Sequence, residues 1–312
     1  MTYAVIFPGQ GAALPGAGQP WVDHPAWQVV REAEAATGRP LARLLLDADA
    51  DELATTGASQ MAVLLTSLVA WHAVDDTLPG RPVAFAGHSL GQNTALLAAG
   101  VVAPADGYRL ARHRADASQR SADARPGRMA ALMGTDPAAA AALCAEGADA
   151  WVANDNAPGQ VVVAGTPEGV DALAERARAA GVRKVMPLAV GHAFHTPLLA
   201  DAADELGPTL ASTPFRATEV PVVTNTDATA AGAPADWPGL LARHLVEPVR
   251  WRETQLALAD LGATTFVEVG PGRVLAGLAR RTVPDVTVHN VATPDDVAAL
   301  AATLSPAGAH GL

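Results

Sequence analysis

The segment formed by residues 83–100 constrains the fold of this chain more than any other. Residues 83–86, Val-Ala-Phe-Ala, are apolar and end in small side chains, which predicts a buried strand. Residues 87–91, Gly-His-Ser-Leu-Gly, come next, and residues 92–99 show a helical pattern that ends at Gly100. A strand, a G-x-S-x-G turn and a helix are the context of a nucleophile elbow, which presents a serine, here Ser89, at a helix N-terminus. The alternative is an ordinary turn between a strand and a helix.

Composition indicates a globular enzyme. The 312 residues can form one large or two unequal domains, and 50% hydrophobic residues with few aromatic ones suit helices packed on a buried sheet. The net charge of −11 argues against nucleic acid or an anionic membrane as the main partner. The single cysteine, Cys144, excludes an internal disulfide and a cysteine-based metal cage, and we expect no metal site. Since neither a charged leader nor an apolar run of membrane length is recognised, we expect a cytoplasmic protein.

The order of the expected elements changes between residues 126 and 190. The pattern there predicts a strand, a helix, two strands, a helix and a strand, which is the ferredoxin-like plan. These elements are expected at residues 129–133, 137–145, 150–153, 160–164, 167–180 and 183–189, with a turn at 154–159. We therefore predict an α/β fold in which residues 1–125 and 191–300 form a hydrolase-like body with a mainly parallel sheet. Residues 126–190 form an inserted ferredoxin-like subdomain in this prediction, and residues 301–312 a tail.

The body is expected to alternate strands and helices. Strands are predicted at residues 3–7, 83–86, 220–224 and 265–269, and helices at residues 26–37, 60–74, 92–99, 107–122, 198–206, 240–245 and 274–281, with a surface loop at 232–238. Pro-Gly-Gln-Gly at residues 8–11 follows the first strand directly. Because ligands of α/β proteins bind at loops that leave the C-terminal ends of parallel strands, this loop is a candidate for the site.

A serine nucleophile needs a base and two donors for an oxyanion. His192 and His195 are the candidate bases, because they lie in a Gly/Pro-flanked turn where the chain re-enters the body. Either could instead be a solvated loop histidine. An esterase of the α/β-hydrolase type would also need an acid and an HG-type oxyanion loop, and the sequence marks neither.

Seven motifs, taken in order, resemble a known family. They are Phe-Pro-Gly-Gln-Gly at 7–11, Gly-His-Ser-Leu-Gly at 87–91, Arg114, Asn-Asp-Asn-Ala-Pro-Gly-Gln at 154–160, Phe-His-Thr-Pro-Leu at 194–198, Pro-Val-Arg-Trp at 248–251 and Glu-Val-Gly-Pro-Gly at 268–272. The chain resembles malonyl-CoA:acyl carrier protein transacylases, including discrete acyltransferases of polyketide pathways, from the first strand to about Arg281.

The resemblance implies a ping-pong acyl transfer without a permanently bound cofactor. Ser89 would take the malonyl group from malonyl-CoA as an ester, and His195 would act as the base for both half-reactions. The backbone N–H groups of Gln10 and Leu90 would form the oxyanion hole. Arg114 would bind the malonyl carboxylate through two parallel hydrogen bonds, although a solvated arginine on a helix surface is the alternative.

Further residues receive roles through the same resemblance. His192 and Phe194 are expected to favour malonyl over branched acyl groups, because Phe194 would fill the space beside the acyl C2 atom. Supporting roles are expected for His88, Gln60, Asn156 and His244. Four positions depart from the family pattern. His244 stands where Gln or Asn is usual, Gln92 stands where Glu is common, and Ala115 and Ser118 replace the usual Gly and Met beside the arginine.

The acceptor is expected to be an acidic acyl carrier protein, which requires a local basic patch on this acidic chain. The candidates are Arg250, Arg273, Arg280 and Arg281, and a solvated helix face is the alternative. No coiled-coil pattern is present, and we expect a monomer.

Two other functions remain open at this stage. The same Ser89–His195 pair could hydrolyse acyl groups from carrier proteins, although the carboxylate preference implied by Arg114 has no use there. The chain could also be a non-catalytic carrier-binding scaffold, which an intact serine, histidine and arginine set argues against.

Overall fold

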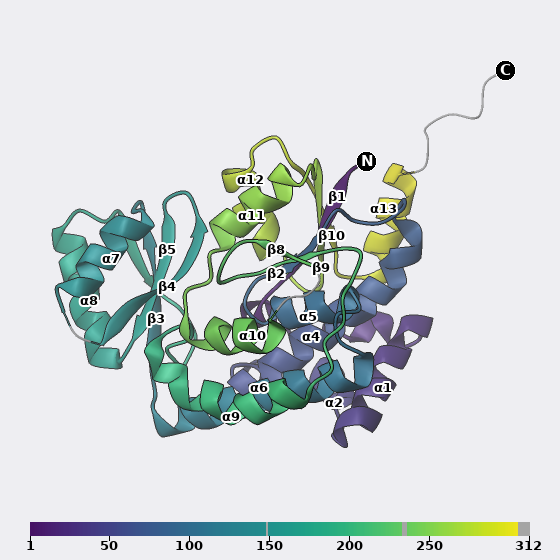
Figure 1. Ribbon diagram of the computed structural model, residues 1–312, viewed down its shortest axis with the longest axis horizontal. Helices are drawn as coiled ribbons and strands as arrows, with labels where there is room; N and C mark the ends of the chain where they lie inside the picture. Colours follow the sequence, from purple (N-terminus) through teal and green to yellow (C-terminus); the bar gives the residue numbers. More distant parts are fainter. Residues whose placement is uncertain (148, 233–235, 305–312) are drawn as a thin grey trace.

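The computed structural model describes residues 1–147, 149–232 and 236–304. A six-stranded sheet forms the centre of the body, with the order β10-β9-β1-β2-β7-β8 (Figure 1). Its strands are β1 Tyr3–Phe7, β2 Phe85–Gly87, β7 Val222–Val223, β8 Ala230–Ala231, β9 Thr265–Val269 and β10 Thr287–Val291. Neighbours from β10 to β7 pair in parallel, and β7 pairs with β8 antiparallel. The expected mainly parallel sheet is confirmed.

Helices cover both faces of this sheet. The body helices are α1 Gln28–Thr37, α2 Ala42–Leu46, α3 Ala50–Leu53, α4 Thr56–Val74, α5 Gly91–Ala98, α6 Pro104–Ala124, α9 Ala200–Ser212, α10 Trp237–Val246, α11 Trp251–Asp260, α12 Val274–Thr282 and α13 Pro294–Leu304. Alternate residues of β1 point to opposite faces, so Val5 and Phe7 join the core with α1, α4 and α6 while Ile6 joins the core with α11 and α12. Because both faces are buried, the strand is a continuous apolar run.

Helix α4 is the central helix of the larger core. The segment Thr56–Thr77 is long and apolar enough to cross a membrane, with a mean hydropathy of 1.3, and 78% of that window is buried inside the protein. Our expectation that the chain has no apolar run of membrane length is therefore wrong for this segment. Its burial against α1, α5 and α6 is that of a core helix.

A separate four-stranded antiparallel sheet lies beside the body (Figure 1, left). Its order is β4-β5-β3-β6, with β3 Arg128–Met133, β4 Ala150–Ala157, β5 Gln160–Gly165 and β6 Lys184–Pro187. Helices α7 Pro137–Ala145 and α8 Pro167–Ala179 pack on it around their own apolar core. The chain order of these elements is strand, helix, two strands, helix, strand, as in the ferredoxin-like plan. The limits 126–190 for this part of the chain stay a proposal.

Strand β4 is longer than expected. Residues 154–157 were expected in a turn, because Asn, Asp, Pro and Gly dominate the segment 154–159, but they belong to the strand. Two irregularities in the pairing with β5 accommodate them. The extended end also reaches the body, where Asp155 N–H donates to the Val249 carbonyl at 2.9 Å and Val249 N–H to the Ala153 carbonyl at 2.9 Å. Tertiary pairing overrides the local turn signal here.

The remaining differences are elements that the sequence pattern does not predict. Helices α2, α3, α11 and α13 and strands β8 and β10 are not predicted from the sequence, and α13 includes residues 301–304 of the expected tail. Residues 305–312 of that tail, and residues 233–235 of the expected surface loop, lie outside the described residues.

The parallel sheet brings several loops to one edge. Phe7 pairs with Gly87 in register, so the loop after β1, which contains Gln10, lies beside the turn that contains Ser89. Strand β7 pairs with β2 on the other side and ends at Val223, which places residues 224–226 at the same edge. The carboxyl edge of the sheet therefore holds the candidate loops.

The glycines of the turn are required by close packing. A Cβ atom at Gly91 would overlap the Phe7 carbonyl, and one at Gly87 would overlap the backbone of Gly91. At Gly277, an exposed position inside α12, a Cβ atom would meet nothing within 4 Å.

We predict opposite effects of Gly91→Ala and Gly277→Ala on the free energy of unfolding, measured by urea denaturation. Gly91→Ala lowers it by at least about 2 kcal/mol, because strand and helix must separate. Gly277→Ala raises it by about 0.5–1 kcal/mol, since alanine is the better helix former. Equal effects of the two changes would show that the turn is not closely packed.

Candidate active site

Ser89 lies in the turn between β2 and α5 with a strained backbone. Its φ of 51° is in the left-handed region, which non-glycine residues rarely adopt. The turn is fixed from the strand side by a hydrogen bond from His88 N–H to the Phe7 carbonyl at 2.9 Å. The structure therefore gives the 87–91 motif the strand-turn-helix geometry that a nucleophile elbow requires.

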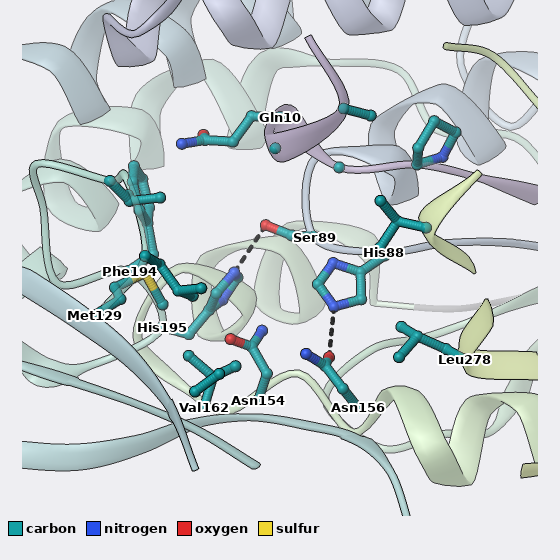
Figure 2. A pocket seen from close by; sticks show the side chains of 18 of the residues that line it. Gln10, His88, Ser89, Met129, Asn154, Asn156, Val162, Phe194, His195 and Leu278 are labelled. Atoms are coloured by element: carbon teal, nitrogen blue, oxygen red, sulfur yellow. Dashed lines mark hydrogen bonds between the residues drawn. The ribbon is translucent and has the colours of Figure 1, made fainter. Parts of the chain in front are cut away.

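Ser89 and His195 lie within hydrogen-bonding distance. Ser89 Oγ is 2.7 Å from His195 Nε2, and His195 also has a left-handed backbone, with φ 60° (Figure 2). His195 Nδ1 lies 2.8 Å from the backbone carbonyl of His244. Because a carbonyl can only accept, Nδ1 carries a proton, and in the neutral ring Nε2 is free to accept the serine proton. The arrangement can activate a hydroxyl.

His244 supports the base through its backbone. The sequence leaves open whether its imidazole can replace the usual Gln or Asn side chain, and the geometry shows that the carbonyl makes the contact instead. The imidazole lies beside that of His195, with ring centroids 5.2 Å apart. Its buried Nε2 atom has no hydrogen-bond partner among the described residues.

Buried imidazoles in this region are held neutral. Burial, and then the charge of Arg114, lowers the pKa of His195 to about 3. Burial lowers the pKa of His192 to about 4, and it also lowers the pKa of His88 and, well below the ordinary value, that of His244. Neutral His195 is the form that a general base needs at neutral pH.

The candidate oxyanion donors come from two neighbouring loops. Leu90 precedes the first residue of α5, and Gln10 begins a 3-10 helix, Gln10–Ala12, after β1. Neither backbone N–H donates a hydrogen bond to another group in the part of the chain that the structure describes. In Figure 2, Ser89 lies between the Gln10 loop and His195. Two free N–H groups beside a hydroxyl are what a tetrahedral oxyanion requires.

Arg114 is a buried cation that has no carboxylate partner in the part of the chain that the structure describes. Its side chain on α6 is 3% exposed, and burial lowers its pKa to about 10, so it is charged at neutral pH. Nη1 donates to Gln60 Oε1 from α4, while Arg114 Nη2 and Gln60 Nε2 have no acceptor among the described residues. A buried cation is stable only when paired, so this pair of donors suits a carboxylate. The surface-arginine alternative is wrong.

A cavity of about 360 Å³ opens between the two sheets at Ser89. The body contributes Gln10, His88, Ser89, Phe194 and His195 to its lining, and the antiparallel sheet contributes Met129, Ala131, Asn154, Asn156, Gln160 and Val162. His88 Nε2 and Asn156 Oδ1 are 2.8 Å apart across this boundary (Figure 2). Part of the sequence-based set therefore lines one cavity. Leu90, Gln60, Arg114, His192 and His244 are not among the lining residues.

His192 and Phe194 have different places at the site. Phe194 lines the cavity, whereas His192 lies behind it, with the two rings edge to face and centroids 5.4 Å apart. His192 Nδ1 lies 3.1 Å from the Arg125 carbonyl. His192 can therefore act on the cavity only by packing against Phe194.

Three of the four candidate docking arginines lie on α12 or, for Arg273, directly before its first residue. Arg273, Arg280 and Arg281 are exposed, and residues Val274, Leu275 and Leu278 of the same helix line the cavity. Arg281 Nη2 donates to Gln160 Oε1 at the cavity wall. Arg250 differs, since it is half-buried and paired with Glu253.

One residue at the site was missed by sequence reasoning. Asn225, two residues beyond β7, contacts the serine turn directly, because its Oδ1 accepts from Ser89 N–H at 2.8 Å. A single asparagine after a short strand carries no motif. Its position was detectable only as the end of a predicted strand.

The buried imidazoles predict a loss of stability in acid. Their pKa values are lower in the folded than in the unfolded chain, so the unfolded chain binds more protons below about pH 6.5. The stabilisation is complete above that pH and is lost as the pH falls towards the folded-state values of about 4 for His192 and about 3 for His195. Each imidazole contributes a slope of up to about 1.4 kcal/mol per pH unit.

We predict that His244→Gln reduces the pH dependence of the free energy of unfolding, measured by urea denaturation between about pH 7 and 5. The expected reduction is up to about 1.4 kcal/mol per pH unit, the contribution of one imidazole. A slope for His244→Gln equal to that of the wild type would show that His244 is not held neutral.

Comparison with known proteins identifies the family. A family model described as the acyl transferase domain matches residues 4–308. The malonyl CoA-acyl carrier protein transacylases of Salmonella typhimurium and Escherichia coli K12 are 37% and 38% identical to this chain, covering 97% and 95% of it and 99% and 98% of those proteins. The solved malonyl-CoA:acyl carrier protein transacylase of Xanthomonas oryzae has a TM-score of 0.91 at 37% identity, covering 97% of this chain and 99% of that one.

A second solved structure is a malonyl-transacylase in complex with a type II polyketide synthase acyl carrier protein. Its TM-score is 0.92 at 31% identity, and the match covers 97% of this chain and 100% of that one. The resemblance recognised in the sequence is confirmed: this chain belongs to the acyl transferase family.

Proposed function

We propose that this chain transfers a malonyl group, or a related carboxylated acyl group, from coenzyme A to the phosphopantetheine thiol of an acyl carrier protein. The observation that carries the proposal is the contact of Ser89 Oγ with a neutral His195 at 2.7 Å, near the buried Arg114, whose Nη2 has no acceptor among the described residues. Near-complete alignment with malonyl CoA-acyl carrier protein transacylases supports it. Malonyl-CoA is the substrate, and no permanently bound cofactor takes part.

In the first half-reaction Ser89 Oγ attacks the thioester carbonyl while His195 Nε2 takes its proton. The N–H groups of Gln10 and Leu90 stabilise the oxyanion. The C–S bond then breaks, coenzyme A leaves as its thiol with the proton from His195, and an acyl ester remains on Ser89.

In the second half-reaction His195 takes the proton of the carrier thiol, and the sulfur attacks the ester carbonyl. Ser89 Oγ leaves and recovers its proton from His195, so the enzyme returns to its starting state. Apolar side chains in the cavity lining, such as Met129, Val162 and Phe194, disfavour water beside the ester.

Acyl selection rests on Arg114 and Phe194. The free donors of Arg114 and Gln60 can bind a substrate carboxylate in the bidentate manner that an ammonium group cannot reproduce. Phe194 in the cavity wall crowds the acyl C2 atom, with His192 packed behind it. His88 and Asn156 hold the two sheets together at the cavity.

The carrier protein approaches along α12 in this proposal. Arg273, Arg280 and Arg281 present positive charge beside the cavity, which suits an acidic carrier helix, whereas Arg250 is occupied by Glu253. The proposal includes a monomeric, cytoplasmic protein.

Intact-protein mass spectrometry after mixing with malonyl-CoA, methylmalonyl-CoA and acetyl-CoA tests the proposed function. We predict a malonyl adduct that maps to Ser89, is absent in Ser89→Ala and disappears on addition of holo-carrier with formation of malonyl-carrier. An adduct that persists in Ser89→Ala contradicts the serine mechanism. Release of free malonate instead of malonyl-carrier would assign hydrolysis.

Arg114→Ala should lower the rate of malonylation at least about thirtyfold and abolish the preference for malonyl over acetyl, because a buried charge-assisted contact is lost. Arg112→Ala, on the same helix but paired with Asp116, is the matched control and keeps both. A variant at Arg114 that still prefers malonyl would remove the carboxylate role.

Charge reversal on α12 tests the docking face. Arg280→Glu combined with Arg281→Glu should raise the KM for the carrier on the order of tenfold at low salt and leave malonylation by malonyl-CoA unchanged. Arg31→Glu combined with Arg39→Glu reverses two exposed charges on and after α1, away from the cavity, and serves as the control. An unchanged carrier KM would exclude this face.

A further inference from the structure

Asn225 lies beside the nucleophile turn and forms hydrogen bonds through both its side chain and its backbone. It is completely buried, and β2 and β7 are neighbours, so the end of β7 carries it to the turn after β2. Its Oδ1 accepts from Ser89 N–H at 2.8 Å, and its Nδ2 donates to the Gly87 carbonyl at 2.8 Å. One carboxamide thus holds the backbone on both sides of the strained serine turn.

The backbone of Asn225 is fixed as firmly as its side chain. Its N–H donates to Gln92 Oε1 at 2.7 Å, and its carbonyl accepts from Arg250 N–H at 2.9 Å. Gln92 lies in the first turn of α5 and is buried, so it supplies an acceptor without a buried negative charge. This gives a physical role to a position where the sequence departs from the common Glu.

The contact with Asn225 also determines which backbone N–H group of the turn is available to an oxyanion. Because Ser89 N–H is occupied by Asn225, it cannot serve a developing oxyanion, while the next N–H, that of Leu90, remains free. A serine keeps a left-handed backbone conformation only where contacts with its surroundings hold it there. The side chain of Asn225 forms two of the hydrogen bonds that hold this turn.

We infer that Asn225 is a positioning residue for acyl transfer, whose carboxamide holds Ser89 in the left-handed conformation that directs Oγ to His195 and leaves Leu90 N–H to the oxyanion. The inference rests on the proposed function for its reaction. It does not require any contact between Asn225 and the substrate. Its effect is therefore on the rate of the chemical step and not on the binding of malonyl-CoA.

The chemistry of the carboxamide suggests a variant with a pH signature. Asn225→Asp is nearly isosteric, but an ionised carboxylate cannot donate to the Gly87 carbonyl, whereas the protonated acid can donate there and still accept from Ser89 N–H. Burial raises the pKa of a carboxyl group, which brings this switch into the range of about pH 5 to 8.

The base itself does not titrate in that range, because burial lowers the pKa of His195 to about 3. Burial also lowers the pKa of His88, and it raises the pKa of Asp155, whose carboxylate is paired with Arg252. Hydrogen bonds to Glu253 and Asp227 raise the pKa values of Arg250 and Arg243, and the bond to Arg250 lowers the pKa of Glu253. The wild-type acylation rate should therefore be flat over this range.

The test measures acylation by malonyl-CoA in single-turnover mixing between about pH 8 and 5.5. We expect Asn225→Asp to acylate at least about tenfold more slowly at pH 8 with unchanged half-saturation by malonyl-CoA, and to recover most of the rate as the pH falls. Asn225→Ala should be slow at every pH. Thr254→Val, which removes a buried hydroxyl bonded to the carbonyls of Thr224 and Arg250, is the matched control and should keep the wild-type rate.

Two further measurements distinguish a failure of this inference from a failure of the proposed function. Gln92→Met removes the acceptor for Asn225 N–H and leaves Asn225 itself unchanged, so it tests the inference even if variants at Asn225 do not fold. We expect Gln92→Met to slow acylation. Gln92→Glu keeps an acceptor and should retain the wild-type rate. Labelling of Ser89 by a fluorophosphonate reports nucleophilicity without malonyl-CoA. Folded variants at Asn225 and Gln92 that acylate and label at the wild-type rate at pH 8 would overturn the inference, whereas a wild-type protein that labels but is not malonylated would overturn the proposed function alone.

Discussion

The contact between Ser89 Oγ and His195 Nε2 is the interaction on which the rest of the structure depends, because its two ends lie 106 residues apart in the sequence. The serine end requires the glycines that let β2 and α5 approach, and a left-handed backbone. The histidine end requires the chain to form the antiparallel sheet, whose last strand is β6 Lys184–Pro187, before it reaches His195. Packing of strand β4 of the antiparallel sheet against α11 and α12 of the body thus helps to close one hydrogen bond beside a cavity.

A neutral His195 follows from the groups that surround it. The third member of the set is a backbone carbonyl, which holds the ring in the required tautomer but does not stabilise an imidazolium as a carboxylate does. Arg114 and two further buried imidazoles, His88 and His244, face the same region and add no negative charge. The site is therefore poor in acceptors for charge, and an anionic acyl group is the partner that its electrostatics favour. In the proposed reaction, a substrate carboxylate bound at Arg114 offsets the positive charge that lowers the pKa of His195.

The sequence was most informative where backbone constraints leave a residue signature. Apolar strands followed at once by glycine-rich loops located Gln10 and Ser89, and the family motifs located Arg114 and His195, which the structure brings to one region. The mainly parallel sheet was equally predictable, because its strands are buried on both faces and read as continuous apolar runs.

What escaped prediction depends on contacts between distant segments. Asn225 acts through the adjacency of β2 and β7, which a lone asparagine does not encode. Any residue at position 244 could supply this backbone carbonyl, so the identity of the side chain there does not determine the contact with His195. The turn expected at residues 154–157 became strand because pairing with β5 and with Val249 outweighed local turn composition.

Nitrogen NMR of protein labelled at histidine tests the central claim most directly, because it reports the protonation of each ring nitrogen of His195. The account predicts a neutral ring at pH 7, with the proton on Nδ1 and none on Nε2, that stays neutral until the pH approaches the value of about 3 set by burial and Arg114. An imidazolium signal for His195 near pH 6, or a proton on Nε2 in the neutral ring, would contradict it.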